Sequence, residues 1–247
     1  MTDANFGVSF LTAHWRYLAM LNYEIAPEIL MPLMPKGTEL DAWNGKTLVS
    51  MVGFLFLNAR VMGVAIPFHR NFEEINLRFY VRRRAEDGWR RGVVFVKEIV
   101  PRAAIALTAR WLYNENYVAL PTGNAILRSQ TNPDSTESVK YFWRFMNQTH
   151  AIELVARGEP MHFAEGSEEE FIAQHYWGYS SQRDGGTVEY RVDHPPWRIW
   201  QAQSCRLECD VERLYGGQFA RALSKDPSSA FLAEGSEITV YKGRRIA

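Results

Sequence analysis

Alternation of apolar and polar residues identifies Phe72–Arg82 as a β-strand. Every second residue from Ile75 to Val81 is apolar, and every second residue from Glu74 to Tyr80 is polar or amphipathic: Glu74, Asn76, Arg78 and Tyr80. Because successive side chains of a strand point to opposite faces, the pattern predicts one apolar face and one polar face. Asp87-Gly88 then predicts a tight turn. The apolar run GVVFVKEIV that follows predicts a buried second strand of the same hairpin.

Turn and capping signals predict further elements. Pro27 suits the first turn of a short helix to Met34, and the following Pro35-Lys36-Gly37 ends it. Asn44-Gly45 predicts another hairpin, and Ser167 followed by Glu170 predicts a capped helix that extends to Trp177. We also expect a helix at 103–114, a loop at 128–138, and strands at 188–192, 200–211 and 237–241.

The order of these elements favours an α+β fold built on a large, mostly antiparallel sheet. Strands outnumber helices, and hairpins join them instead of helical crossovers. No repeat, low-complexity tract or long linker divides the 247 residues. We therefore expect a single domain spanning residues 1–247.

Composition excludes several classes of protein. The 28 basic residues balance the 28 acidic ones, whereas nucleic-acid-binding and polybasic membrane-binding proteins carry a positive excess. We expect neither kind of partner. Cys205 and Cys209 are too few for a disulfide framework and predict reduced thiols in the cytoplasm. The six histidines lack metal-ligand spacing, so we expect no metal and no other cofactor.

The polar face of the 72–82 strand is the first candidate site. On an outer surface such a row is an ordinary solvated face. If it faces a cavity, Glu74, Asn76, Arg78 and Tyr80 are suited to bind a small polar ligand. Periodicity alone leaves both interpretations open.

Two cations follow on the second strand of the hairpin. Lys97 is the only lysine in an apolar strand. It either forms an ion pair, with Glu74 as the expected partner because Glu98 points to the other face, or acts as a neutral amine that attacks carbonyl groups. Arg102, after Pro101, either binds an anion or lies exposed in a loop. The basic hairpin tip is a solvated turn or, alternatively, an anion or partner site; its arginines are Arg82, Arg83, Arg84, Arg90 and Arg91.

Several ordered segments together resemble the YqjF-like family of uncharacterised bacterial proteins. They are HWRYLAMLNYEIAPEILMPLMPKG (14–37), DAWNGKTLVSMVGF (41–54), FEEINLRFYV (72–81), KEIVPR (97–102), ARWLYNENY (109–117) and HPPW (194–197). Each segment alone is a weak signal, but the ordered set covers nearly the whole chain. That family in turn resembles acetoacetate decarboxylase.

The resemblance implies a cone-shaped, largely antiparallel β-barrel with a small internal cavity and a few flanking helices. The decarboxylase forms a Schiff base on a lysine of a Pro-Lys-Lys run, which follows a strand carrying a glutamate. The resemblance places Glu98 on that glutamate, Pro101-Arg102-Ala103 on the Pro-Lys-Lys run, and Glu74 on a further acidic residue. Arg102 then replaces the catalytic lysine, and a permanently protonated guanidinium forms no useful imine.

Three functions compete on these grounds. The first is a protein that binds a small anionic or carbonyl-containing molecule in its cavity without Schiff-base chemistry. The second is a lyase or hydrolase acting on a small keto acid with Glu74 and Arg102. The third is a non-catalytic structural or partner-binding module whose barrel is filled by Phe54, Phe56 and Phe79. The oligomeric state stays open; Trp177, Trp197 and Trp200 are candidates for an interface between copies.

Overall fold

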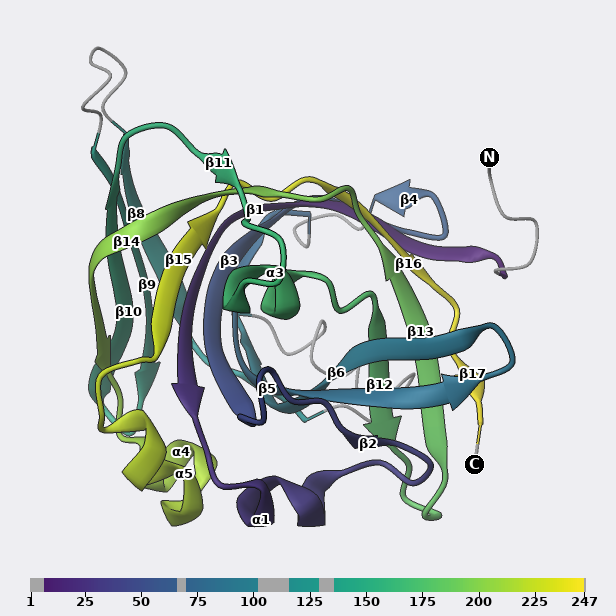
Figure 1. Cartoon of the computed structure of the whole chain (residues 1–247). Coiled ribbons are helices and arrows are strands. Elements are labelled where there is room, and N and C mark those ends of the chain that lie inside the picture. The colour runs from purple at the N-terminus through teal and green to yellow at the C-terminus, as the bar shows by residue number, and fades with distance from the viewer. Residues whose placement is uncertain (1–6, 66–69, 102–115, 129–135, 247) are drawn as a thin grey trace.

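The computed structural model describes residues 7–65, 70–101, 116–128 and 136–246 (Figure 1). Strands dominate it. They are β1 (Ser9–Glu24), β2 (Glu39–Leu40), β3 (Leu48–Val61), β4 (Val64–Ala65), β5 (Phe72–Ala85), β6 (Gly88–Val100), β7 (Tyr117–Ala119), β8 (Thr122–Arg128), β9 (Thr136–Phe145), β10 (Gln148–Arg157), β11 (Met161–His162), β12 (Trp177–Ser181), β13 (Thr187–Asp193), β14 (Arg198–Glu208), β15 (Ser229–Ala233), β16 (Glu237–Tyr241) and β17 (Arg244–Arg245). The helices are α1 (Pro27–Leu30), α3 (Glu168–Ala173), α4 (Val211–Tyr215) and α5 (Gly217–Leu223), with a 3₁₀ turn, η1, at Met31–Leu33.

Pairings between strands form a circuit that returns to its start. β1 pairs with β3, β3 with β5, and β5 with β6. β6 then pairs with β12, β12 with β13, β13 with β16, and β16 with β1. The β6–β12 contact is parallel and the other pairs of the circuit are antiparallel, which confirms the predicted strand-rich, mostly antiparallel architecture.

A second layer packs against one side of this circuit. β8, β9, β10 and β14 form it through antiparallel pairs. Strand β15 connects this layer to the circuit, because it pairs with both β14 and β1. The outer cluster of apolar side chains, which includes Leu77, Phe79 and Trp143, lies between the two layers together with α4 and α5. The inner cluster, which includes Met20, Val52 and Phe171, lies on the opposite face of the circuit strands.

Helix α3 lies against the inner face. Phe171 packs its ring 5.5 Å from that of Tyr80 in β5, and Glu168 accepts a hydrogen bond from Ser229 of β15 at 2.6 Å. The predicted cap is present, because the Ser167 side chain accepts from the backbone N–H of Glu170. The helix has six residues and ends at Ala173, well before the predicted end at Trp177. Trp177 instead begins strand β12, which pairs with β6 and β13.

Most of the other predicted turns and helices are confirmed. The Asn44-Gly45 turn and the β5–β6 hairpin form where predicted, and the first helix spans α1 and η1. The predicted 128–138 loop is wrong at its ends, since β8 and β9 pair as far as Arg128 and Glu137. The predicted 103–114 helix lies outside the described residues. Trp197 and Trp200 are 3% and 4% exposed, so they belong to the core and do not form an exposed interface.

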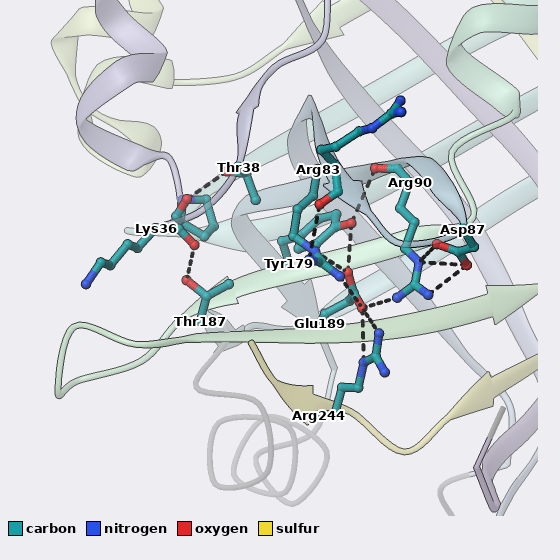
Figure 2. Close-up of polar contacts among 11 residues, drawn as sticks. Lys36, Thr38, Arg83, Asp87, Arg90, Tyr179, Thr187, Glu189 and Arg244 are labelled. Carbon is teal, nitrogen blue, oxygen red and sulfur yellow. Dashed lines mark hydrogen bonds and ion pairs between the residues drawn. The ribbon is translucent and has the colours of Figure 1, made fainter. Parts of the chain in front are cut away.

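A buried carboxylate on β13, Glu189, holds the tip of the β5–β6 hairpin close to the place where β6 pairs with β12 (Figure 2). Glu189 accepts hydrogen bonds from Arg83 at 2.7 Å, Arg90 at 2.6 Å, Arg244 at 3.1 Å and Tyr179 at 3.1 Å. Its side chain is fully buried. Burial alone would raise the pKa of Glu189, but its arginine partners outweigh this and lower it. Much of the basic tip is therefore a structural ion-pair network.

Candidate functional site

The polar row of β5 lies on the inner face. Glu74, Asn76, Arg78 and Tyr80 are 4%, 1%, 8% and 1% exposed, so the row is not a solvated surface. Asn76 is directly opposite Val52 of β3, a member of the inner cluster. Since directly opposed residues of antiparallel strands share a face, the row looks inward with that cluster.

Two atoms of this row lack hydrogen-bond partners. Asn76 donates from Nδ2 to Oε1 of Glu74 at 3.1 Å, which orients its amide. Its Oδ1 and the Nε of Arg78 are buried, and neither has a partner within the described structure. Arg78 contacts only the weak acceptor Sδ of Met20 with its Nη2, at 3.8 Å, among the hydrogen bonds seen for its side chain. An acceptor on Asn76 and a cationic donor on Arg78 therefore lie on neighbouring inward-facing positions of β5.

Tyr80 ends a buried chain of hydrogen bonds. Ser50 donates to Oδ1 of Asn22 at 2.6 Å, so the 2.5 Å contact between Ser50 and Tyr80 has the tyrosine hydroxyl as donor. Asn22 donates to Ser229 at 2.9 Å, and Ser229 donates to Glu168 at 2.6 Å. The chain links β5, β3, β1 and β15 to the first turn of α3 and fixes the inner face.

A β-bulge decides which residue of β6 joins the row. Strands β5 and β6 pair without a break from their connecting turn to the Arg78–Phe95 pair. Between Arg78 and Leu77 the register shifts by one residue. Glu98 thereby comes opposite Asn76, whereas Lys97 comes opposite Leu77. Because a one-residue slip exchanges the faces of a strand, the shift brings Glu98 to the row and turns Lys97 outward.

Lys97 lies in the outer layer, apart from the row. Its Nζ donates to the backbone carbonyl of Leu214 in α4 and lies 5.5 Å from the centre of the Tyr215 ring. Burial lowers the pKa of Lys97, and nearby Cys209 opposes this. The expected ion pair with Glu74 does not form. The structure thus brings Glu74, Asn76, Arg78, Tyr80 and Glu98 together without Lys97; Arg102 lies outside the described residues.

Sequence reasoning missed a histidine beside the row that is hydrogen-bonded to an aspartate. Asp41 Oδ2 accepts from Nε of Arg91 at 2.6 Å and lies 3.2 Å from Nε2 of His175. The His175 ring packs 4.7 Å from that of Tyr80 and 4.9 Å from that of Phe171. No motif or periodicity announces this group, because Asp41 precedes a turn and His175 follows a helix far along the chain.

Burial, hydrogen bonds and neighbouring charges together set the ionisation of Asp41 and His175. Burial lowers the pKa of His175 to about 4, although the hydrogen bond with Asp41 opposes the shift, and the charges of Arg91 and Arg78 lower it further. Burial alone would raise the pKa of Asp41, but the hydrogen bonds with His175 and Arg91 outweigh it and lower that pKa. At neutral pH the pair is therefore an aspartate beside an uncharged imidazole.

A cleft of about 730 Å³ is lined by residues of β6, β12, β13 and β16. Tyr176, Trp177 and His194 line part of it, with Arg90 and Asp87. The His194 ring stacks on Trp197 at 4.1 Å. Burial lowers the pKa of His194 to about 4, opposed by its hydrogen bond with the Pro195 carbonyl, and the charge of Arg78 adds to the lowering. The HPPW segment thus contributes His194 and Pro195 to this cleft, while its Trp197 packs in the inner cluster.

With this geometry established, comparison with known proteins identifies the family. The model of DUF2071, described as an uncharacterized conserved protein family, matches residues 12–237. The chain belongs to the DUF2071 family. The chain is also similar to the uncharacterized protein YqjF of Bacillus subtilis (strain 168), with 25% identity over 201 residues that cover 80% of this chain and 78% of YqjF. The resemblance drawn from the sequence segments is confirmed.

Solved structures place this DUF2071 member in the acetoacetate decarboxylase-like fold. The acetoacetate decarboxylase of Legionella pneumophila superimposes with a TM-score of 0.65 at 12% identity, over 100% of this chain and 92% of the decarboxylase. The enduracididine biosynthesis enzyme MppR, in complex with pyruvate, gives a TM-score of 0.66 at 10% identity, over 100% of this chain and 93% of MppR. These similarities establish the fold.

None of the helices within 7–65, 70–101, 116–128 and 136–246 is long and apolar enough to span a membrane. Over the same ranges, His, Cys, Asp and Glu side chains form no group of three suited to a metal ion.

Proposed function

We propose that the strand circuit is a cone-shaped β-barrel that binds a small carboxylate-bearing or carbonyl-containing molecule at its inner polar row, without forming a Schiff base. The ligand's anionic or carbonyl oxygen accepts from Arg78, and Asn76 contacts a neighbouring polar group. Glu74 orients Asn76 through their hydrogen bond.

The buried, unsatisfied atoms of Asn76 and Arg78 carry this proposal. A buried polar group without a partner costs about 1–3 kcal/mol, and more when it is charged. Folded proteins therefore satisfy nearly all such groups with protein atoms, water or ligand. Here an acceptor and a donor lie on adjacent inward positions of one strand, an arrangement that suits a ligand with both kinds of group.

The distribution of lysines supports non-covalent binding. All six lysines of the chain fall within the described residues. Lys97 lies on the outer face, and Lys140 pairs with Glu153 in the second layer. The others are exposed; they are Lys36, Lys46, Lys225 and Lys242. No lysine contact with the polar row is seen, and the resemblance puts an arginine at the position of the decarboxylase lysine.

One structural neighbour supports the ligand class by analogy of fold. MppR was solved in complex with pyruvate, a small keto acid, and its fold covers the whole of this chain. At 10% identity this similarity concerns the fold, so the choice of ligand rests on the side chains of the row.

The test combines calorimetry with chemical trapping. Pyruvate is titrated into the protein, and a parallel sample is treated with pyruvate and sodium borohydride before intact-mass analysis. We expect a dissociation constant of about 1 mM or tighter and no added mass, because no imine is available for reduction. A borohydride adduct on any lysine refutes the non-covalent mechanism.

Arg78→Met is the decisive variant. It removes the donor, and it also removes a poorly satisfied buried charge, so we expect unchanged or greater stability with at least about tenfold weaker pyruvate binding. Arg82→Met is the matched control, because Arg82 pairs with Glu39 at the exposed hairpin tip. Equal pyruvate affinity in both variants and wild type excludes Arg78 from the site. Absence of binding in wild type favours the inert structural module.

A further inference from the structure

The Asp41 contact fixes the position of the proton on His175. The carboxylate Oδ2 accepts from Arg91 and lies 3.2 Å from Nε2 of His175. An ionised carboxylate has no proton to donate, so Nε2 must carry the hydrogen of this bond. A neutral imidazole has a single N–H, and its other nitrogen is then an acceptor. Nδ1 of His175 therefore presents a lone pair.

That lone pair has no partner. Nδ1 of His175 is buried and without a hydrogen bond anywhere in the described structure, and the side chain is 1% exposed. The ring packs against Tyr80 and Phe171 of the inner cluster. Nδ1 of His175 thus joins Oδ1 of Asn76 and Nε of Arg78 among the buried atoms of this side of the sheet that have no hydrogen-bond partner in the described structure.

Whether each of these atoms donates or accepts a hydrogen bond restricts the chemical class of the ligand. Arg78 offers a cationic donor and needs a ligand oxygen as acceptor, whereas His175 and Asn76 offer acceptors and need ligand donors. A keto acid ionised at neutral pH has only acceptors, so it satisfies Arg78 alone. A hydroxy acid carries a carboxylate for the arginine and an O–H group for one of the acceptors.

We propose that His175, held in one tautomer by Asp41, is a specificity-determining residue that accepts a hydrogen bond from the ligand's hydroxyl group, so that the site selects small hydroxycarboxylates over the corresponding keto and unsubstituted acids. This proposal rests on the proposed function, since it names the substrate class of the same polar row.

Calorimetric titration of three acids with one carbon skeleton tests the preference. Lactate carries a hydroxyl group, pyruvate a ketone and propionate neither. A second set, with 3-hydroxybutyrate and butyrate, moves the hydroxyl by one carbon. We expect the hydroxy acid of at least one set to bind about tenfold or more tightly than its partners, because only it satisfies a buried acceptor.

His175→Phe removes the acceptor and keeps an aromatic ring against Tyr80 and Phe171. We expect this variant to bind lactate and propionate equally while its affinity for propionate stays that of wild type. His150→Phe is the matched control, since His150 is also a buried histidine but stacks on Trp143 in the second layer. It should retain the full hydroxyl preference.

Nitrogen-15 NMR of histidine-labelled protein provides a readout that needs no ligand. The wild-type spectrum should show His175 as the neutral Nε2–H tautomer with a bare Nδ1; a protonated Nδ1 overturns the proposal. If the acids bind without preference for the hydroxyl, the proposal fails and the proposed function stands. If none of the acids binds, both fail.

Discussion

Replacing Glu189 by glutamine removes the buried carboxylate that three arginines contact. Arg83 and Arg90 have side chains only 18% and 10% exposed, whereas Arg244 is 60% exposed. Breaking a buried ion pair costs about 3–5 kcal/mol, and an exposed one contributes about 0–1 kcal/mol. The two buried partners therefore dominate. We expect Glu189→Gln to lose about 3–5 kcal/mol of unfolding free energy, measured by urea denaturation.

The glutamine variant keeps one acceptor oxygen but directs an N–H₂ group toward guanidinium donors, which is why a nearly isosteric change is costly. Asp184→Asn serves as the control, because Asp184 pairs with Arg245 in solvent, and we expect no measurable change. A loss for Glu189→Gln as small as that of the control refutes the view that this network holds the circuit where β6 meets β12.

The same substitution has a defined pH dependence. The pKa of Glu189 is lowered in the folded state from the ordinary value of 4.5. Above that value the carboxylate is charged in both states and its stabilisation is fully present; below it the unfolded chain takes up the proton first. The stability difference between wild type and Glu189→Gln should therefore be constant above about pH 5 and shrink on further acidification.

Three further variants test other parts of the account. The pKa values of His175 and His194 are about 4 in the folded state, against an ordinary value of 6.5. Between these pH values the unfolded chain binds more protons, so the free energy of unfolding falls on acidification. His175→Phe should reduce the slope of unfolding free energy against pH by up to about 1.4 kcal/mol per pH unit in urea melts. Lys97→Met should leave pyruvate affinity unchanged in calorimetry and cost about 1–2 kcal/mol by leaving an α4 carbonyl unpaired; weaker binding would place Lys97 in the site. Gly92→Ala sets a Cβ 2.5 Å from a β12 carbonyl and should lower urea-denaturation stability by about 1–3 kcal/mol; a neutral result would contradict the close β6–β12 contact.

The strands of this chain can be predicted from the sequence because they follow from local rules. Alternation defined the two faces of β5, and turn residues placed the β5–β6 hairpin, since both depend only on neighbours in sequence. Which face looks inward depends on how distant strands close the circuit, and alternation carries no such information. The same applies to the short α3, because Trp177, at the predicted end of the helix, instead begins strand β12 and pairs with β6.

The candidate site was predictable in part. The row from Glu74 to Tyr80 was found by its spacing, but the role of Lys97 depended on one bulge. Without the extra residue in β6, continued pairing would set Lys97 opposite Asn76; the shift sets Glu98 there. Asp41 and His175 are 134 positions apart, and only tertiary packing brings them together.

The central claim is that a small carboxylate binds non-covalently at the inner polar row. A crystal structure of the protein soaked with lactate or pyruvate tests it most directly. The account predicts ligand density within hydrogen-bond distance of Arg78 Nε, separate from every lysine side chain. Density continuous with a lysine Nζ, or an inner face that holds no ligand while calorimetry shows no binding, would contradict it.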